Sequence, residues 1–361
     1  MEGLRKNPRI LVITLRRLGD VLLTTPLIRT LKAGFAGCSV DALVFRGTEG
    51  MLEGNPDLDG VIAIPQRPST AEIAGLIRLL WRRYDLAVPT HTGDRPTLFA
   101  WVAGRHRVGF VAGADSGAWW KRRVFDRHAL SKADNHRVSE LLRLADLLGV
   151  PRRHEIVCPA SATAAAVALP GRYAVLHASP LYRIRRWTDD GWRALARALA
   201  DRGLAVVATG GPDPAEKDYL DRLFGAIELP IVRRDGTLSW PQITALLRGA
   251  AVYVGPDTSM THLAAGAGAP TVALYGPASP SLTGPWPVAW PVGGLETPWA
   301  RAGTIQHRGN VWVVQNPLPC MPCDKLGCQG HLNSYSRCLD ELPVQQVLAA
   351  VDQALALRAA A

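Results

Sequence analysis

An acid, two hydroxyls and a histidine follow an apolar run in the second half of the chain. Ala250 to Val254 has the character of a buried strand, and a helix rich in small residues is predicted from about Thr258. In open parallel sheets ligands bind beyond the carboxyl ends of strands, and a helix N-terminus offers free amides to anions. The junction therefore predicts a phosphate-binding segment made of Asp257, Thr258, Ser259 and His262. Taken alone, His262 is as readily explained as a structural group.

A basic loop follows another predicted strand, Tyr173 to His177. Guanidinium groups bind phosphates in bidentate geometry and can neutralise the charge of a departing diphosphate. The alternative is a solvated loop packed over Trp187. The polar residues of the loop that we single out are Ser179, Arg183, Arg185 and Arg186.

Asp20 lies between the first predicted strand, Arg9 to Leu15, and the helix that follows it. Its carboxylate can have either of two roles at this position. It can cap the helix, since Asp is a preferred N-cap residue, or it can act as a general base if it lies within reach of a hydroxyl. Arg16 and Arg17 precede it, and nearby cations would keep it ionised.

Apolar strands and amphipathic helices alternate along the chain and then restart. The N-terminal strands are predicted at Arg9 to Leu15, Ser39 to Phe45, Val61 to Ile64 and Asp85 to Val88. After a Pro- and Ala-rich linker, Pro151 to Pro170, the alternation resumes at Tyr173. This order is typical of βαβ units and parallel sheets. We therefore predict an α/β protein of two Rossmann-like domains, residues 1–160 and 161–361, with the last helix returning to the first domain.

Composition narrows the class of protein. The 361 residues suffice for two domains, and 48% hydrophobic and 20% charged residues indicate a globular chain. No apolar run approaches the ~20 residues of a membrane helix, and we see no secretory signal, so the expected compartment is the cytoplasm. The net charge of +10 favours a polyanionic partner of some kind.

Four of the six cysteines lie close together near the C-terminus. Cys320 and Cys323 have the spacing of metal ligands, but Cys328 and Cys338 do not form a second such pair. We expect reduced structural thiols here, with a metal site as the alternative.

A second basic segment contains tryptophans. Trp119 and Trp120 precede Lys121, Arg122 and Arg123, a pattern that suits a membrane interface or an anionic glycolipid. The alternative is a half-buried Trp pair with a solvated charged edge.

The chain resembles glycosyltransferase family nine, the ADP-heptose:lipopolysaccharide heptosyltransferases. The resemblance extends from about Arg9 to Val347 and is carried by the strings RRLGDVLLTTP, RIRRW and GPDTSMTHLAA. Many relatives have Lys where this chain has Arg185, and Gly where it has Ser259. Within the family, the first two strings favour the heptosyltransferase III-like branch.

The resemblance implies a GT-B fold, two Rossmann-like domains facing across a cleft, and inverting transfer of heptose from ADP-L-glycero-β-D-manno-heptose to an inner-core lipopolysaccharide sugar. It implies Asp20 as general base and Arg185 at the leaving group, with no cofactor, no metal and no nucleic acid.

The Gly210-Gly211 turn resembles the nucleotide-side loop, from which Glu216 would reach the ribose unless it is a solvated helix charge. Peripheral contact with the cytoplasmic face of the inner membrane would suit such an acceptor. The remaining assignments are donor-binding Ser179, Arg183, Arg186, Asp257, Thr258, Ser259 and His262, and acceptor-binding Arg16, Arg17, Lys121 and Arg122.

Three rival functions differ in class or substrate. A transferase could use another nucleotide sugar, or could heptosylate a protein. A dinucleotide-dependent oxidoreductase should carry GxGxxG after the first strand, but Arg16 to Asp20 reads RRLGD. A metal-binding module centred on Cys320 to Cys338 would leave the Asp20 motif unexplained.

Overall fold

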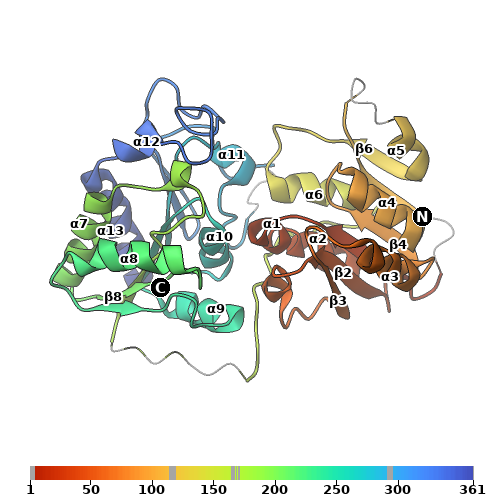
Figure 1. Ribbon diagram of the computed structural model, residues 1–361, viewed down its shortest axis with the longest axis horizontal. Helices are drawn as coiled ribbons and strands as arrows, with labels where there is room; N and C mark the ends of the chain where they lie inside the picture. Colours follow the sequence, from red (N-terminus) through yellow and green to blue (C-terminus); the bar gives the residue numbers. More distant parts are fainter. Residues whose placement is uncertain are drawn as a thin grey trace. The chain divides into compact units, whose positions relative to one another are not determined.

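The computed structural model describes residues 5–113, 119–163, 167, 169, 171–290 and 296–360 (Figure 1). The chain divides into two compact units, Met1–Pro159 (unit 1) and Ala160–Ala361 (unit 2). Parts of the predicted linker, Pro151 to Pro170, and of the Pro- and Trp-rich segment at 284–301 lie outside the described residues.

Unit 1 is built on a parallel sheet whose strands follow the order β3-β2-β1-β4-β5-β6. Its central strands are buried almost throughout, as expected when helices cover both faces of a parallel sheet. The order reverses between β1 and β4, and such a switch point is where open α/β sheets bind ligands. The strands are β1 (Arg9–Thr14), β2 (Ser39–Phe45), β3 (Gly60–Ile64), β4 (Tyr84–Pro89), β5 (Gly104–Val111) and β6 (Arg127–Leu130).

Helices of unit 1 form two layers. α2 packs against α6, and α3 packs against α4, which also lies on β1, β4 and β5. Right-handed crossovers place these two pairs on opposite faces of the sheet. Ser69 and Glu72 form a reciprocal capping box that starts α3. The helices are α1 (Leu18–Leu22), α2 (Thr25–Gly34), α3 (Thr70–Leu80), α4 (Asp94–Ala103), α5 (Trp119–Val124) and α6 (Arg137–Asp146), with a 3₁₀ turn, η1 (Glu49–Leu52).

Unit 2 repeats the design with the strand order β12-β13-β11-β10-β7-β8-β9. All neighbouring pairs are parallel except β12 and β13. The switch point lies between β7 and β10, so the loops after these two strands meet at one edge of the sheet. The strands are β7 (Tyr173–Leu176), β8 (Ala205–Ala208), β9 (Ile231–Arg233), β10 (Val252–Pro256), β11 (Thr271–Leu274), β12 (Ile305–Arg308) and β13 (Val311–Val314).

Side-chain caps start several helices of unit 2. Thr188 accepts from the Gly191 amide at the start of α7, and Asp213 accepts from the Ala215 amide at the start of α8. The helices are α7 (Asp189–Asp201), α8 (Pro214–Gly225), α9 (Trp240–Gly249), α10 (Ser259–Gly266), α11 (Pro280–Thr283), α12 (Arg337–Asp340) and α13 (Val344–Ala360), with the turn η2 (Arg183–Arg185).

The last helix, α13, packs within unit 2. It lies on β10, β11, β13 and α7, and its apolar residues Val347, Ala350, Val351 and Ala354 belong to the core of that unit. The sequence predicts that this helix returns to the first domain, and the contacts that the structure gives for its apolar residues are with the core of unit 2. Over the described ranges, no helix combines the length and apolar character that spanning a bilayer requires.

Candidate active site

Asp20 lies at the switch point of unit 1, in the first turn of α1. It does not cap this helix: the N-cap is Arg17, and no side chain makes the capping hydrogen bond. The Asp20 carboxylate instead pairs with the guanidinium groups of Arg16, at 2.9 Å, and Arg137, at 3.3 Å. Both contacts reach Oδ1. Among the described residues none donates a hydrogen bond to Oδ2, and the side chain is 21% exposed.

Arg137, in the first turn of α6, was not singled out from the sequence. Burial lowers the pKa of its guanidinium to about 10, against the opposing effect of Asp20, so it stays charged at neutral pH. The predicted partners of Asp20 were Arg16 and Arg17. Arg16 does pair with it, whereas the second cation comes from a helix far along the chain.

His91 follows β4 and completes the same end of the sheet. Burial, followed by the charges of Arg16 and Arg137, lowers the pKa of His91 to about 4, so the imidazole is neutral at physiological pH. Its Nδ1 is buried and, within the part of the chain that the structure describes, has no hydrogen-bond partner. The available signal for this histidine was its position three residues beyond the predicted strand Asp85 to Val88.

Three buried threonine hydroxyls join the ends of β1 and β4 to α1. Thr90 Oγ1 donates to Thr14 Oγ1 at 3.1 Å, and Thr14 Oγ1 donates to Thr24 Oγ1 at 3.3 Å. Thr24 Oγ1 in turn donates to the carbonyl of Asp20 at 2.8 Å. This chain of hydroxyls holds the backbone of Asp20 in place, so that the carboxylate position is determined by the strand ends.

Asp257 joins the two loops at the switch point of unit 2. Arg185 Nη2 lies 3.1 Å from Asp257 Oδ2, and Arg185 Nη1 donates to the Asp257 carbonyl at 2.6 Å. The buried Tyr275 hydroxyl donates to Asp257 Oδ1 at 3.2 Å, and His262 Nε2 lies 3.9 Å from the same oxygen. The sequence motifs GPDTSMTHLAA and RIRRW are thus brought together through one carboxylate.

Helix α10 begins beside this carboxylate without a side-chain cap. Its N-cap is Thr258, which makes no capping hydrogen bond. Asp257, the residue before it, does not cap the helix either, because its carboxylate contacts Arg185 and Tyr275. An uncapped helix start leaves first-turn amides for an anion, next to the half-buried Thr258 and Ser259.

The other arginines of the loop have different surroundings. Arg186 stacks over the ring of Tyr219, 4.0 Å from its centroid, and Arg183 is exposed. Trp187 is buried beneath the loop, and its indole donates to the Leu342 carbonyl at 3.1 Å. Both readings of the sequence therefore apply to parts of this loop: a packed Trp supports it, and one arginine engages the predicted donor segment.

Glu216 lies over the loop that follows β8. Ser179 Oγ donates to Glu216 Oε1 at 2.5 Å, which ties the loop after β7 to helix α8. A Cβ on Gly211 would stand 2.6 Å from Glu216 Oε2, so only glycine lets the carboxylate approach this backbone. Glu216 is half-buried, not the solvated helix charge that was the alternative.

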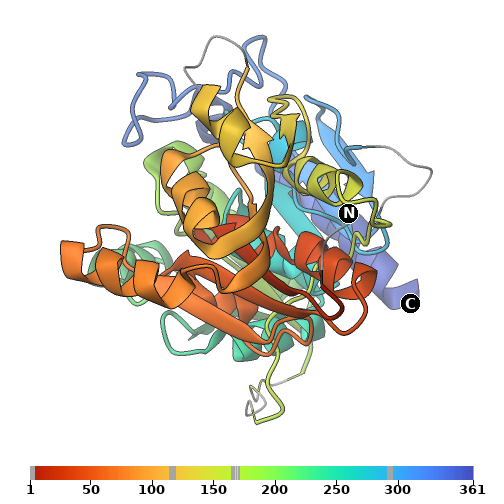
Figure 2. The same ribbon diagram turned by 90° about the vertical axis from the view of Figure 1, so that its right-hand side faces the viewer.

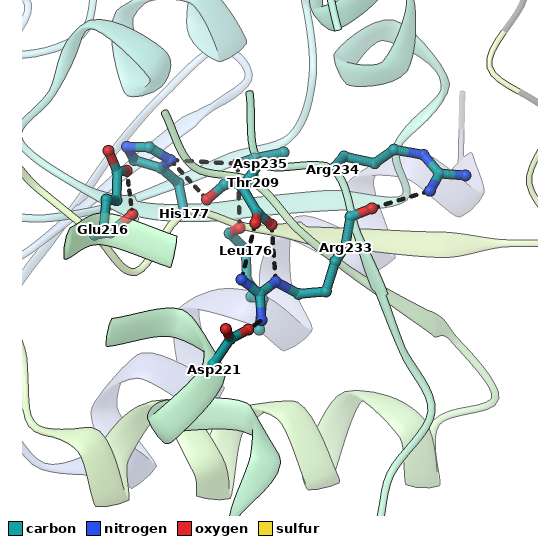
Figure 3. A network of polar contacts seen from close by, with 9 residues as sticks. Leu176, His177, Thr209, Glu216, Asp221, Arg233, Arg234 and Asp235 are labelled. Atoms are coloured by element: carbon teal, nitrogen blue, oxygen red, sulfur yellow. Dashed lines mark hydrogen bonds and ion pairs between the residues drawn. The ribbon is translucent and has the colours of Figure 1, made fainter. Parts of the chain in front are cut away.

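Figure 3 shows His177 beside Glu216 at this end of the sheet. His177 Nδ1 lies 3.2 Å from the Thr209 carbonyl, and burial lowers the pKa of the ring although Glu216 acts in the opposite direction. Lower in the same view, Arg233 bonds Asp235 at 2.8 Å and Asp221 at 2.7 Å. These contacts hold the ends of β7, β8 and β9 together around the Gly210-Gly211 turn.

Lys121, one of the predicted acceptor residues of α5, lies beside the loop that carries His91, and its charge contributes to lowering the pKa of that histidine. Lys121 is buried, pairs with Asp94 at 2.6 Å and donates to the Thr92 carbonyl at 2.5 Å. Arg122 is exposed.

The C-terminal cysteines are all free thiols, and Cys338 is buried while Cys320 and Cys328 are exposed. Burial raises the pKa of Cys338 to about 12, so this thiol is protonated at neutral pH. Over the described residues, no group of three or more His, Cys, Asp or Glu side chains is arranged to hold a metal ion.

Comparison with known proteins matches residues 74–298 to the model of glycosyltransferase family 9 (heptosyltransferase). Lipopolysaccharide heptosyltransferase 3 of Escherichia coli K12 is 25% identical over 74% of this chain and 82% of its own length. Lipopolysaccharide heptosyltransferase 1 of Pseudomonas aeruginosa PAO1 is 27% identical over 94% of this chain and 93% of its own.

Solved structures show the fold class. The structure of E. coli ADP-heptose lps heptosyltransferase II superposes with a TM-score of 0.73, at 20% identity, over 98% of this chain and 100% of that one. The likeness confirms the predicted α/β fold of the GT-B class.

Proposed function

The chain belongs to glycosyltransferase family 9, the heptosyltransferases, and from this premise we propose that it transfers heptose from ADP-L-glycero-β-D-manno-heptose to an inner-core sugar of lipopolysaccharide. The two relatives described above, which match this chain over more than three quarters of their own length, are named lipopolysaccharide heptosyltransferases. The solved structure described above is named for ADP-heptose. In the proposed reaction the configuration at the anomeric carbon is inverted.

Unit 1 supplies the base in this proposal. The acceptor hydroxyl oxygen attacks the anomeric carbon, the bond from that carbon to the diphosphate breaks, and the hydroxyl proton passes to Asp20 Oδ2. The observation that carries the proposal is the pairing of a 21% exposed Asp20 carboxylate with two cations, Arg16 and Arg137. The two ion pairs orient the carboxylate, and its exposed part leaves room for an acceptor hydroxyl.

Unit 2 supplies the donor site. Arg185 and the first-turn amides of α10 would stabilise the negative charge that develops on the departing ADP. Thr258 and Ser259 would add hydroxyl donors at the same helix start. Arg183 and Arg186 remain candidates for the same diphosphate. Glu216, an acceptor of hydrogen bonds beside the Gly211 backbone, suits the ribose hydroxyls of the nucleotide.

We infer that the enzyme works at the cytoplasmic face of the inner membrane as a peripheral protein. The inference follows from the substrates, because the proposed donor is a nucleotide sugar and the proposed acceptor is attached to a lipid. A peripheral protein of this kind must have a surface that contacts the bilayer.

Donor and acceptor can be tested together with purified protein. We expect ADP-heptose and a lipopolysaccharide truncated before the proposed heptose to give a product heavier by one heptose unit in mass spectrometry. A panel of other nucleotide sugars serves as the donor control, and an acceptor protein replaces the lipopolysaccharide in a second control. Transfer only from another nucleotide sugar, or only to protein, would contradict the proposed substrates while leaving the family assignment intact.

A further inference from the structure

Three exposed tryptophans distinguish unit 1 from unit 2. Trp81 is 58% exposed, Trp101 46% and Trp119 63%, whereas the described tryptophans of unit 2 are buried or half-buried. An indole on the surface of a soluble domain leaves a large apolar area in water, and several together mark an interaction site. The exposed tryptophans of unit 1 therefore point to a partner that contacts this unit.

Two of these indoles belong to neighbouring segments of unit 1, the end of α3 and the helix α4. Trp81 directly follows α3, and the amide of the next residue, Arg82, donates to the Val102 carbonyl of α4 at 2.9 Å, beside Trp101. Figure 2 shows α3 and α4 on the side of unit 1 turned toward the viewer. The apolar members of this surface, which we call the tryptophan face, are the exposed Ile77, Trp81, Leu98 and Trp101.

Arginines border the tryptophan face without compensating acids. They are Arg78, Arg82, Arg95 and Arg105, all exposed. Arg95 donates to the Gln66 carbonyl at 2.8 Å and Arg82 to the Gly104 carbonyl at 3.5 Å, so these contacts leave their charge uncancelled. None of the four forms an ion pair with a carboxylate in the described ranges of the chain.

The acidic residues that lie closest in sequence to these arginines interact with other residues. Asp94, at the start of α4, pairs with Lys121 at 2.6 Å. Glu72, in the first turn of α3, accepts from Ser69 and lies 3.6 Å from Arg46. The surface therefore combines exposed indoles with net positive charge, and its complement is an apolar layer bordered by anions.

We propose that the tryptophan face docks on an anionic lipid bilayer. Indoles favour the headgroup level, where their apolar body and polar N–H are both satisfied. Arginine side chains beside them reach the lipid phosphates while their methylene stems rest on the apolar layer. The inference extends the proposed function, whose acceptor is lipid-linked, but lipid binding can be measured with no sugar substrate present.

The test uses the full-length protein and sedimentation with vesicles. Wild type should bind vesicles of phosphatidylethanolamine with phosphatidylglycerol and bind phosphatidylcholine vesicles far less, with an affinity that falls as salt rises. Trp81→Ser combined with Trp101→Ser should weaken binding by about tenfold or more, because binding scales with buried apolar area. Arg78→Gln combined with Arg105→Gln should cost roughly fivefold for each charge removed.

Matched variants separate lipid contact from misfolding. The pair Trp81→Phe and Trp101→Phe should keep most of the binding, and Leu357→Ser, an exposed apolar position of unit 2, should bind like wild type. Equal thermal unfolding midpoints would establish that the Ser variants fold. Equal binding to anionic and neutral vesicles, or unchanged binding by the double Ser variant, would refute the proposal. Loss of self-association instead of lipid binding in that variant would assign the face to a second copy of the chain.

The result of the vesicle-binding experiment can be distinguished from the result of the heptose-transfer experiment. Failure to bind vesicles together with transfer of heptose to a soluble truncated acceptor would remove only the lipid surface. Binding to anionic vesicles without any transfer would remove only the proposed substrates.

Discussion

Two aspartates, one in each unit, lie at the switch points of their parallel sheets and pair with arginines in different ways. Asp20 has both guanidinium contacts on Oδ1 and its side chain is 21% exposed. Asp257 is 5% exposed, with Tyr275 on one carboxylate oxygen and Arg185 at the other. The Asp20 carboxylate is thus the more accessible of the two, whereas the Asp257 carboxylate is buried and connects the loops after β7 and β10.

The comparison shows that residue type and strand-end position do not determine the role of a carboxylate. Burial and the distribution of donors over its two oxygens do. Asp20 should therefore affect the rate of transfer, and Asp257 should affect donor binding and stability.

The largest effect is expected for Asp20→Asn. The amide keeps the shape of the side chain but cannot accept the proton, so kcat should fall by ~10²–10⁴-fold. ADP affinity, measured by calorimetry, should stay near the wild-type value because the donor site belongs to unit 2. Turnover close to wild type in a folded variant would remove Asp20 from the base role.

Arg185→Ala should lower kcat by about 10²–10³-fold, as expected when a group that stabilises the leaving charge is lost. The loss in kcat should exceed the loss in ADP affinity, since the charge on ADP grows in the transition state. Arg185→Lys is the matched control and should recover part of the rate. An unchanged rate for Arg185→Ala would shift the role to Arg183 or Arg186.

Asp257→Asn should weaken ADP binding by about tenfold, because Arg185 loses the carboxylate that orients it. The free energy of unfolding should also fall, by about 1–3 kcal/mol, the value of a hydrogen bond to a charged group. Calorimetry with ADP and denaturant unfolding measure the two effects. If the variant binds ADP as tightly as wild type, the donor site is not organised by this carboxylate.

Arg137→Gln should reduce kcat by about tenfold while leaving ADP affinity unchanged. Glutamine keeps a donor at the position but removes one of the two positive charges beside the Asp20 carboxylate. Arg137→Lys, which keeps the charge, is the matched control and should recover part of the rate in the same steady-state assay. A rate for Arg137→Gln equal to that of wild type would show that transfer does not depend on this cation.

Chelation is the smallest expected effect. Transfer should continue in EDTA at close to its original rate, because arginine and helix amides can manage the diphosphate charge without a metal ion. Loss of activity in EDTA with recovery on adding a divalent cation would show that the donor site needs a metal.

Strands with mainly apolar runs could be predicted from the sequence, as β1, β2 and β10 were. β5 could not, since it opens with the polar string Gly104 to Arg107, and β9 is only three residues long. β12 was missed for another reason: it is antiparallel to β13 at the edge of the sheet, with a half-exposed, polar sequence. Edge strands are weakly marked because they bury little apolar surface.

The polar groups of the site can be located from the sequence, because Asp20, Arg185 and Asp257 follow apolar runs that must be buried, and this signal is local. Their partners depend on the tertiary structure. Arg137 reaches Asp20 because α6 packs against α2 in the same layer, and Arg185 reaches Asp257 because β7 and β10 are neighbours in the sheet. Hydrophobic periodicity can be recognised from residues that are close together in the sequence. The distance between two charged groups depends instead on how whole helices and strands pack.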